Sequence, residues 1–320
     1  MTAIKKISAR KVVMVSFLVD LLDVLTNLVV AVLTGSAVVF GEMAQGIADS
    51  IGSALLVIGE RRAARPRDTE HPLGYAREAF FWGLLSAVAM LVIGAGLSGW
   101  RGVQQLLHPE PLQTPALAVA VLMLAVATNG YAVSLSGRKL VAEIGGLRTI
   151  FRNFNQPLVK GAFLRDVIGT FTSIVGLCAL LLYETLDLLI FDALGAIVAA
   201  LFMTAGSVVL MAQARALITG RAVPETDLQQ LREAILADPK VEAVNDLAAI
   251  YAGASEVLVD ADLDLSEELN TSEIEMVLDS LEVRVRTILP DIERVRVLLN
   301  SPRNTIISRL RKDDRLRAPD

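Results

Sequence analysis

Apolar residues fill the first two thirds of the chain in long runs, broken by short polar segments. Each run is about twenty residues long, the length that an α-helix needs to cross a bilayer. The runs cover 12–34, from the turn at 34–36 to about 60, 79–100, 116–136, 157–183, and from the acidic turn at 184–187 to about 213. This pattern predicts a polytopic membrane protein with a bundle of six transmembrane helices.

The basic residues between these runs predict the orientation. Lysine and arginine gather at the N-terminus, after the second run, after the fourth run and beyond the sixth, with Arg101 as the exception. Six spans would place all four segments on one side, and the positive-inside rule makes that side the cytoplasm. No small-residue cleavage site follows the basic start, so we expect the first helix to be retained rather than removed as a signal peptide.

After Gly220 the pattern becomes that of a soluble α+β domain. Helical periodicity at 224–237 and 272–289 alternates with strand patterns at 241–251, 256–265 and 292–299. Acidic residues dominate this region, whereas 301–320 is basic and is expected to be a solvated tail. The predicted domains are a cytoplasmic N-terminus (1–11), the membrane domain (12–217), the cytoplasmic α+β domain (218–300) and the tail (301–320).

The second predicted span carries polar side chains within apolar sequence. Glu42, Gln45 and Asp49 are three and four residues apart, so they share one helical face. Polar groups of this kind are costly in hydrocarbon and usually mark a pathway for substrates or ions. A neighbouring stripe of small residues, which would let another helix approach closely, is formed by Ala44, Ala48 and Gly52.

The first predicted span has a similar face, made of Asp20, Asp23 and Asn27. These side chains are expected to point inward or towards water. Polar side chains also join helices by hydrogen bonds, so a structural role stands beside a functional one.

Two aspartates on different spans have similar predicted depths. Asp49 lies about 16 Å from the cytoplasmic end of its helix, and Asp166 lies about 14 Å from the same side on the fifth span, at the rise of an α-helix. Two buried carboxylates at one depth repel unless a cation or a proton intervenes. The arrangement fits a cation site, an intramembrane aspartyl protease or a structural contact between helices. The sequence around the aspartates lacks the settings typical of the protease.

Composition limits other chemistry. The single cysteine, Cys178, excludes a disulfide framework and a thiolate metal site, and it is expected to be a buried small residue. His71, next to Pro72, is interpreted as a loop residue that fixes a turn rather than as a ligand. One face of the strand at 256–265 carries three aspartates, Asp260, Asp262 and Asp264. We expect this face to be solvated rather than to bind a divalent ion weakly.

Several short motifs together resemble a known family. They are the Gly35-Ser36 turn, Asp49 thirteen residues after Ser36, and the loop sequences at 63–66, 71–75 (His-Pro-Leu-Gly-Tyr) and 77–78. With them the chain resembles the cation diffusion facilitators, proton-coupled transporters of divalent metals, in the branch similar to zinc transporter 9. The resemblance implies six spans, a cytoplasmic domain of ferredoxin-like fold and a homodimer.

The family places its transport site on spans two and five, at positions that correspond here to Gln45, Asp49, Ala162 and Asp166. Both aspartates are present, whereas Gln45 and Ala162 stand where histidine is common. The resemblance thus implies oxygen ligands, Asp49, Asp166 and Gln45, with Glu42 one turn outward. Such ligands suit manganese, iron(II), or zinc completed by water.

Two further residues acquire a role from the resemblance. Arg165 adjoins Asp166 and could either take the electrostatic place of the metal or extend to the cytoplasmic interface. Asp192 matches a family aspartate that anchors the sixth helix.

The implied function is export of zinc, manganese or iron from the cytoplasm by proton antiport, without enzymatic activity and with no cofactor besides the transported metal. The expected partners are the metal ion, protons, the lipid bilayer and a second copy of the chain, with no nucleic acid. The expected location is a bacterial inner membrane, with both termini cytoplasmic. The alternative is a homologue that does not transport and acts as a scaffold or sensor through its cytoplasmic domain.

Overall fold

The computed structural model describes residues 9–144, 157–253 and 256–299. Within these ranges the side chains of 9–20, 139–144 and 157–162 are not described. The residues fall into two compact units, Met1–Ile218 and Thr219–Asp320. Most of the N-terminus, much of the basic connection after the fourth span and the whole 301–320 tail therefore lie outside the described residues.

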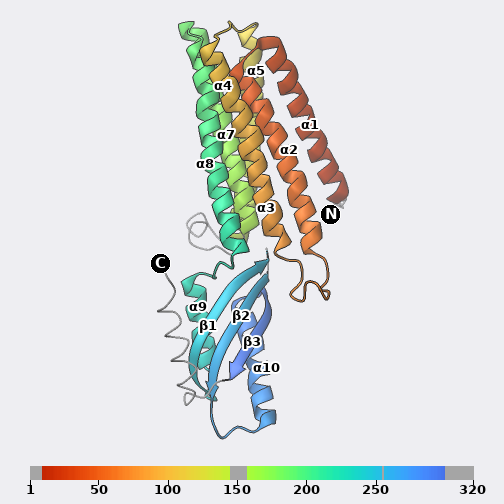
Figure 1. The fold of residues 1–320 in the computed structure, drawn as a ribbon, viewed down its shortest axis with the longest axis vertical. Helices are drawn as coiled ribbons and strands as arrows, with labels where there is room; N and C mark the ends of the chain where they lie inside the picture. Colours follow the sequence, from red (N-terminus) through yellow and green to blue (C-terminus); the bar gives the residue numbers. More distant parts are fainter. Residues whose placement is uncertain (1–8, 145–156, 254–255, 300–320) are drawn as a thin grey trace, which may run out of the picture. The chain divides into compact units, whose positions relative to one another are not determined.

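The first unit is a bundle of long helices that lie side by side (Figure 1). Its helices are α1 (Ala9–Thr34), α2 (Ala37–Ala63), α3 (Glu78–Ala89), η1 (Met90–Ala95), α4 (Gly96–Leu107), α5 (Pro115–Ile144), α7 (Pro157–Leu186) and α8 (Ile190–Ile218). Among the described residues, four helical stretches are long and apolar enough to cross a membrane: Glu78–Leu107, Pro115–Arg138, Phe163–Leu186 and Ile190–Ile218. The count of six spans stays a prediction, with Leu21–Thr34 recorded as a shorter apolar helix.

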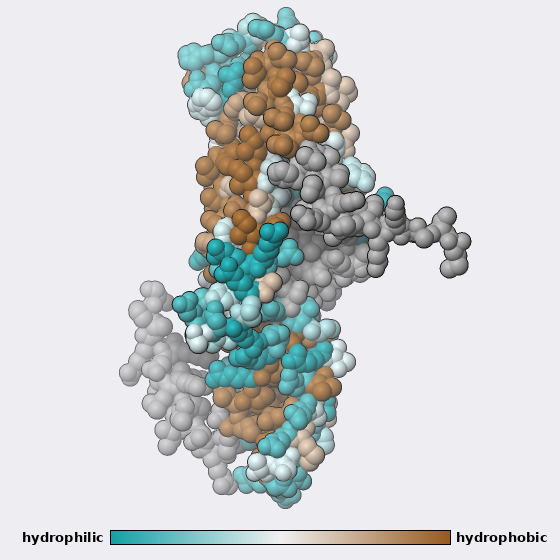
Figure 2. Space-filling model, turned by 90° about the vertical axis from the view of Figure 1, so that its right-hand side faces the viewer, coloured by the Kyte–Doolittle hydropathy of each residue, from teal (hydrophilic) through white to brown (hydrophobic). Residues whose placement is uncertain are grey.

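The outer surface of this unit is apolar. Figure 2 shows hydrophobic side chains along the length of the bundle, with hydrophilic side chains towards its ends. Large apolar residues such as Val32 and Tyr131 are exposed there, as expected of a surface that faces lipid. Cys178 is also exposed, so its predicted burial was wrong. An apolar run in a membrane helix does not mark the interior, since lipid-facing positions are apolar too.

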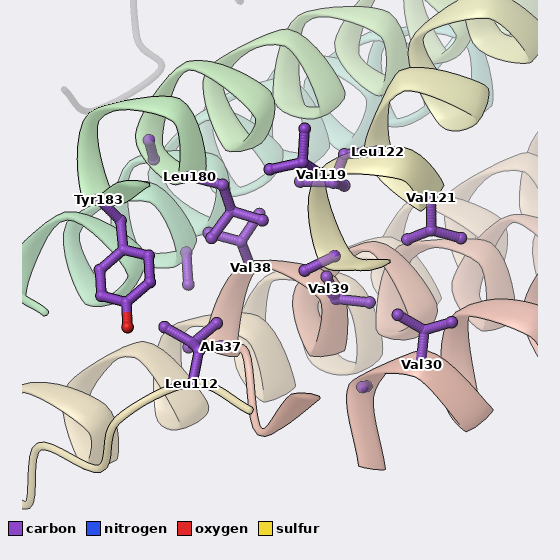
Figure 3. Packing of buried hydrophobic residues seen from close by; sticks show 14 residues of the cluster. Val30, Ala37, Val38, Val39, Leu112, Val119, Val121, Leu122, Leu180 and Tyr183 are labelled. Atoms are coloured by element: carbon purple, nitrogen blue, oxygen red, sulfur yellow. The ribbon is translucent and has the colours of Figure 1, made fainter. Parts of the chain in front are cut away.

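Small residues let the helices approach closely around one apolar core. Val38 and Val39 of α2, Leu122 of α5 and Leu180 of α7 meet there (Figure 3). A methyl group on Gly176 of α7 would lie only 2.4 Å from Val38 Cγ1. The contact between α2 and α7 therefore depends on a residue without a side chain.

The third predicted span is interrupted in a way that the sequence did not indicate. Residues 90–95 form a turn of π-helix between α3 and α4, and Gly94 in this turn packs against α2. A methyl group on Gly94 would lie 3.5 Å from Ala48 Cβ and 3.8 Å from Gln45 Cα. Turns of π-helix are frequent at functional sites.

The second unit has the predicted α+β order. Its elements are α9 (Glu225–Leu236), β1 (Val241–Gly253), β2 (Glu256–Leu265), α10 (Thr271–Ile288) and β3 (Ile292–Leu299). The sheet has the order β1-β2-β3, antiparallel between β1 and β2 and parallel between β2 and β3. Asn270 begins α10 with a capping box to Glu273, which satisfies the free N–H groups of the first turn.

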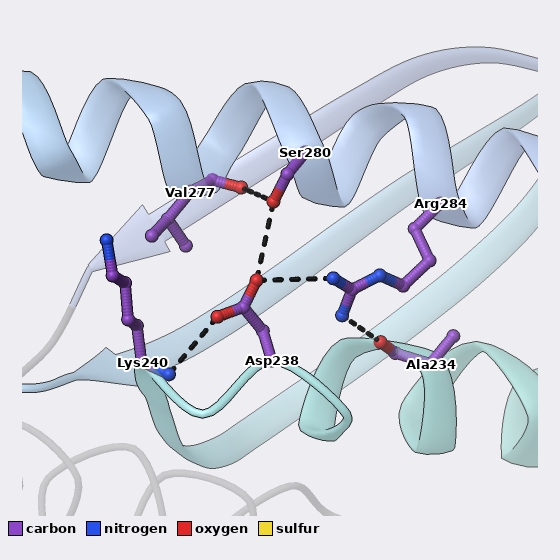
Figure 4. A network of polar contacts seen from close by, with 6 residues as sticks. All are labelled: Ala234, Asp238, Lys240, Val277, Ser280 and Arg284. Carbon is purple, nitrogen blue, oxygen red and sulfur yellow. Dashed lines mark hydrogen bonds and ion pairs between the residues drawn. The ribbon is translucent and has the colours of Figure 1, made fainter.

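A buried carboxylate joins the two helices of this unit. Asp238, just after α9, accepts hydrogen bonds from the Lys240 backbone N–H at 3.1 Å and from Ser280 Oγ at 3.4 Å (Figure 4). It also pairs with Arg284 of α10, whose guanidinium donates to the carbonyl of Ala234 at 3.0 Å. Charge and hydrogen bonds are both satisfied, as a buried acid requires.

The aspartates of β2 do not form a uniformly solvated face. Asp260 is exposed, whereas Asp262 is half-buried and Asp264 is buried. Among the described residues no three histidine, cysteine, aspartate or glutamate side chains lie close enough to hold a metal ion.

Candidate metal site between α2 and α7

The predicted polar face of α2 points into the bundle. Glu42 is 8% exposed and Gln45 is 5% exposed, and Asp49 follows one turn later with a third of its side chain accessible. The small-residue stripe beside them is buried as predicted, and Ala48 and Gly52 lie against η1 and α3. α2 is therefore packed on its small residues while its polar residues face the interior.

Glu42 lies in a hydrogen-bonded network of three helices. Its Oε1 accepts from Ser173 Oγ of α7 at 2.7 Å and from Asn129 Nδ2 of α5 at 3.1 Å. Asn129 Nδ2 also donates to Ser173 Oγ at 2.8 Å. These bonds satisfy a carboxyl group that would otherwise be costly to bury.

Gln45 is held one turn further along α2. Its Oε1 accepts a hydrogen bond of 2.6 Å from Thr172 Oγ1 of α7. A methyl group on Gly169 would lie 2.8 Å from Gln45 Nε2, so the amide fits only because residue 169 lacks a side chain. The Gln45 carbonyl is thereby occupied by a hydroxyl donor.

Asp49 faces a cation supplied by the protein itself. Arg165 Nε of α7 lies 3.6 Å from Asp49 Oδ1, and Arg165 Nη2 donates a hydrogen bond to Ser86 Oγ of α3. The Arg165 side chain is only 13% exposed. Of the two alternatives for Arg165, extension to the interface is therefore wrong, and the structure shows a cation inside the bundle.

Asp166 is half-buried on α7 and interacts with the Ser136 hydroxyl of α5 and with the charge of Arg165. Arg165 thus pairs with Asp49 of α2 and adjoins Asp166 in the sequence of α7. Ala162 belongs to α7, one helical turn before Asp166, and its side chain lies outside the described residues.

On α1, the described part of the polar face is directed inward. Asn27 is buried and its Nδ2 donates to the Asp23 carbonyl at 3.0 Å. Asp23 is half-buried, whereas the Asp20 side chain lies outside the described residues. The expected inward orientation is confirmed for Asn27.

Asp192 anchors the sixth predicted helix, as expected, and its partner is the beginning of α2. It lies at the start of α8, fully buried, and accepts hydrogen bonds from Ser36 Oγ at 2.6 Å and from the backbone N–H groups of Ala37 and Val38 at 2.7 and 3.2 Å. These are free N–H groups of the first turn of α2. Asp192 therefore ties α8 to the beginning of the helix that carries the candidate site.

The loop before α3 is closed around Asp68. Its carboxylate accepts from the Tyr75 hydroxyl at 2.5 Å and from the His71 backbone N–H at 2.7 Å, and the His71 ring stacks on the Tyr75 ring with centroids 4.1 Å apart. The Tyr75 hydrogen bond, with those of the backbone, lowers the pKa of Asp68, and the same bond raises the pKa of Tyr75. His71 fixes the turn, as predicted.

Sequence reasoning missed the partners of the polar face. Asn129, Thr172, Ser173 and Ser86 are single polar residues within apolar helices, and their periodicity does not distinguish them from bundle-filling residues. A usable signal was the adjacent Thr172-Ser173 pair, which interrupts the apolar face of the fifth span near Asp166.

Comparison with known proteins places these features in a family. The model of the cation efflux transmembrane domain matches residues 13–218, and that of the cation efflux protein cytoplasmic domain matches 223–298. Similar proteins include the proton-coupled zinc antiporter SLC30A9, mitochondrial, of Xenopus laevis, 26% identical over 97% of this chain and 58% of that protein. The human protein of the same name is 25% identical over 82% of this chain and 47% of its own length.

The chain thus spans about half the length of these two relatives. The cation-efflux pump FieF of Shewanella oneidensis is 25% identical over 81% of this chain and 83% of the pump. These relatives are named as transporters and not as enzymes, and the two family models together cover most of the chain. The chain belongs to the cation diffusion facilitator (cation efflux) family of membrane transporters, and resembles its zinc transporter 9 branch.

Proposed function

We propose that the protein exports a divalent metal from the cytoplasm in exchange for protons. The observation that carries the proposal is the polar face of α2, where Glu42 and Gln45 are bound to α7 and Asp49 pairs with Arg165 of α7, inside a bundle of this family. A desolvated carboxylate holds a proton or binds a cation, so the arrival of metal releases protons. The relatives described as a proton-coupled zinc antiporter and as a cation-efflux pump support the same activity.

The proposed ligands are Asp49 and Asp166, with the Gln45 carbonyl and the Glu42 carboxylate as further oxygens. No three described carboxylates lie close enough together to hold an ion, so these groups would have to move together when metal binds. Gln45 would exchange its bond from Thr172 for the metal, and Glu42 would exchange its bonds from Ser173 and Asn129. Oxygen ligands suit manganese or iron(II), and zinc would be completed by water.

We further propose six spans, both termini in the cytoplasm and a homodimer in a bacterial inner membrane. The basic loops support the orientation, and the match to a cytoplasmic domain model supports the placement of the second unit. The order α-β-β-α-β with a parallel β2–β3 pair fits a ferredoxin-like pattern that lacks its first strand. The proposed boundaries remain 1–11, 12–217, 218–300 and 301–320.

Transport is tested in proteoliposomes that contain the full chain and a pH-sensitive dye. Zinc, manganese or iron(II) added across a proton gradient should drive proton flux, and Asp49→Asn or Asp166→Asn should abolish it. Asp187→Asn, in the exposed turn between α7 and α8, is the control and should transport like the parent. If none of the metals produces proton flux with the parent protein, the proposal is wrong.

A second candidate is the scaffold or sensor that does not transport. The ion pair of Asp49 with Arg165 favours it, because a fixed cation can replace a metal permanently. In cells that depend on the protein for metal resistance, Asp49→Asn and Asp166→Asn would then have no effect, whereas removal of residues 221–320 would. Loss of resistance in either aspartate variant rules the scaffold out.

A further inference from the structure

We propose that Arg165 is a resident counter-cation of Asp49, and that a transported metal reaches this carboxylate only by displacing the guanidinium. This inference rests on the proposed function. Arg165 Nε and Asp49 Oδ1 are 3.6 Å apart, which is within ion-pair range and longer than a hydrogen bond. Among the described residues Arg165 Nε makes no hydrogen bond. Charge attraction without a directional bond holds the pair, so another cation can replace Arg165.

The guanidinium is positioned by a third helix. Arg165 Nη2 donates to the hydroxyl of Ser86, a fully buried residue of α3. This bond holds the far end of the side chain while its Nε faces Asp49. Ser86 binds Arg165 and would affect metal binding at Asp49 only through it. Ser86 is therefore a positioning residue for the counter-cation.

Gly52 of α2 leaves the space that this arrangement occupies. A methyl group at residue 52 would lie 2.7 Å from Ser86 Oγ and 3.0 Å from Arg165 Nη1. Gly52 therefore permits α2, α3 and α7 to enclose the guanidinium. An arginine that only extended to a membrane interface would need neither the buried serine nor the absent side chain.

A metal ion and Arg165 would compete for Asp49. Two positive charges within a few ångströms repel strongly where water is scarce, since screening is weak there. Arg165 should therefore stabilise the metal-free carrier, because its positive charge lies beside the Asp49 carboxylate inside the bundle. The presence of Arg165 would lower the affinity of the site for metal. It would also favour ions that bind well to the proposed oxygen ligands other than Asp49.

The test measures zinc and manganese dissociation constants for the purified full chain in detergent, by competition with a fluorescent chelator. Arg165→Gln should bind metal at least about tenfold more tightly, the smallest effect that a neighbouring arginine typically has on the affinity of an aspartate for a proton. Arg165→Lys keeps the charge and should stay closer to the parent than to Arg165→Gln. Arg61→Gln, which removes an exposed cation at the end of α2, is the matched control and should change nothing.

Ser86→Ala provides a second variant that keeps Arg165. It should tighten metal binding by less than Arg165→Gln does, and it should have no effect when Arg165 is already glutamine. A purely structural role of Ser86 would give the same change in both backgrounds.

Asp49→Asn separates the two proposals. If it abolishes metal binding while Arg165→Gln and Ser86→Ala bind no more tightly than the parent, the metal site stands and the counter-cation is wrong. If Asp49→Asn leaves the affinity unchanged, the proposed metal site is wrong and the counter-cation falls with it. Tighter binding in Arg165→Gln that is lost on adding Asp49→Asn confirms both.

Discussion

Single side chains in this protein hold helices at defined positions. Asp192 joins α8 to the first turn of α2, and Glu42 joins α2 to α5 and α7. In each case the group is buried, and its oxygens accept hydrogen bonds from neighbouring helices. A buried hydrogen bond of this kind adds little to the free energy of unfolding. The removal of one partner, however, leaves the other buried donors or acceptors without a hydrogen bond, which is costly.

Asp192→Ala should lower the free energy of unfolding by about 2 to 4 kcal/mol, because three buried donors at the start of α2 lose their acceptor. Asp192→Asn keeps one acceptor oxygen and should cost less. The measurement is chemical unfolding in detergent, followed by helical circular dichroism. Asp187→Asn is the control, since Asp187 is exposed. Equal unfolding curves for Asp192→Ala and the parent would show that Asp192 does not stabilise α2.

Tyr75→Phe should raise the pKa of Asp68 towards its ordinary value, because the hydroxyl that contributes most to lowering it is removed. In the parent protein the folded loop lowers this pKa, so the stabilising contribution of Asp68 is complete above the ordinary pKa. It is lost as the pH falls through the lowered one, below about pH 4.

Carbon NMR of labelled aspartate carboxyls, with Asp68 assigned by substitution, measures the titration directly. Tyr131→Phe removes an exposed tyrosine hydroxyl from α5 and should leave the titration of Asp68 unchanged. If Asp68 titrates at the same pH in Tyr75→Phe as in the parent, then the backbone hydrogen bonds alone determine its pKa.

Helices in the first unit are packed on glycine at their closest approaches. Gly195 of α8 faces Ala179 of α7, and Gly206 of α8 faces Ile168, which is also in α7. In a membrane the hydrophobic effect does not drive helices together, so close packing and hydrogen bonds between helices carry more of the stability. Each of these glycines is therefore an element of the architecture rather than a flexible point.

Gly195→Ala should destabilise the bundle by about 1 to 3 kcal/mol, the usual cost of overpacking. The new methyl group would lie 2.5 Å from Ala179 Cβ and 2.8 Å from Val38 Cγ2, and Ala179 cannot rotate away. Gly83→Ala is the matched control in α3, where nothing lies within 4 Å of the new atom.

Because alanine is the better helix former, the control should be neutral or more stable by up to about 1 kcal/mol. Thermal unfolding of both variants in the same detergent gives the comparison. Parallel changes in the two variants would mean that helix propensity, and not the contact of α7 with α8, decides the outcome.

The sequence predicted these elements well and their interruptions poorly. The length of the apolar runs located the long helices, and the alternation of 256–265 located β2. The π-helical turn at 90–95 has no such signal, because its residues are as apolar as their neighbours. The partners of Glu42 and Gln45 were missed for a related reason, since only packing decides which hydroxyl faces which helix.

At the scale of the whole molecule, the chain keeps the framework of its family but differs at two positions of the proposed site. Gln45 and Ala162 each stand four residues before an aspartate, in places where the resemblance implies histidine. Gln45 is held by Thr172, and Asp49 by Arg165, so much of the site is occupied by the protein's own groups. The metal preference should therefore depend on both the missing nitrogen ligands and the resident cation.

The variant Gln45→His with Ala162→His should shift selectivity towards zinc by at least about tenfold relative to manganese, since even second-shell changes at metal sites have effects of this size. Each imidazole would stand one helical turn from an aspartate on the same face, and two nitrogen and two oxygen ligands favour tetrahedral zinc. Arg165 would repel the incoming ion, so the gain should be larger when Arg165→Gln is added.

The measurement is the ratio of zinc to manganese transport in proteoliposomes, with the amount of inserted protein matched between variants. His108→Gln, in the segment between α4 and α5, is the control and should keep the parent ratio, because that histidine ends a helix away from the proposed ligands. If the double histidine variant is folded and inserted but shows the parent ratio with and without Arg165→Gln, the metal does not bind between α2 and α7 at the level of Asp49. The transport pathway would then have to lie along another face of the bundle.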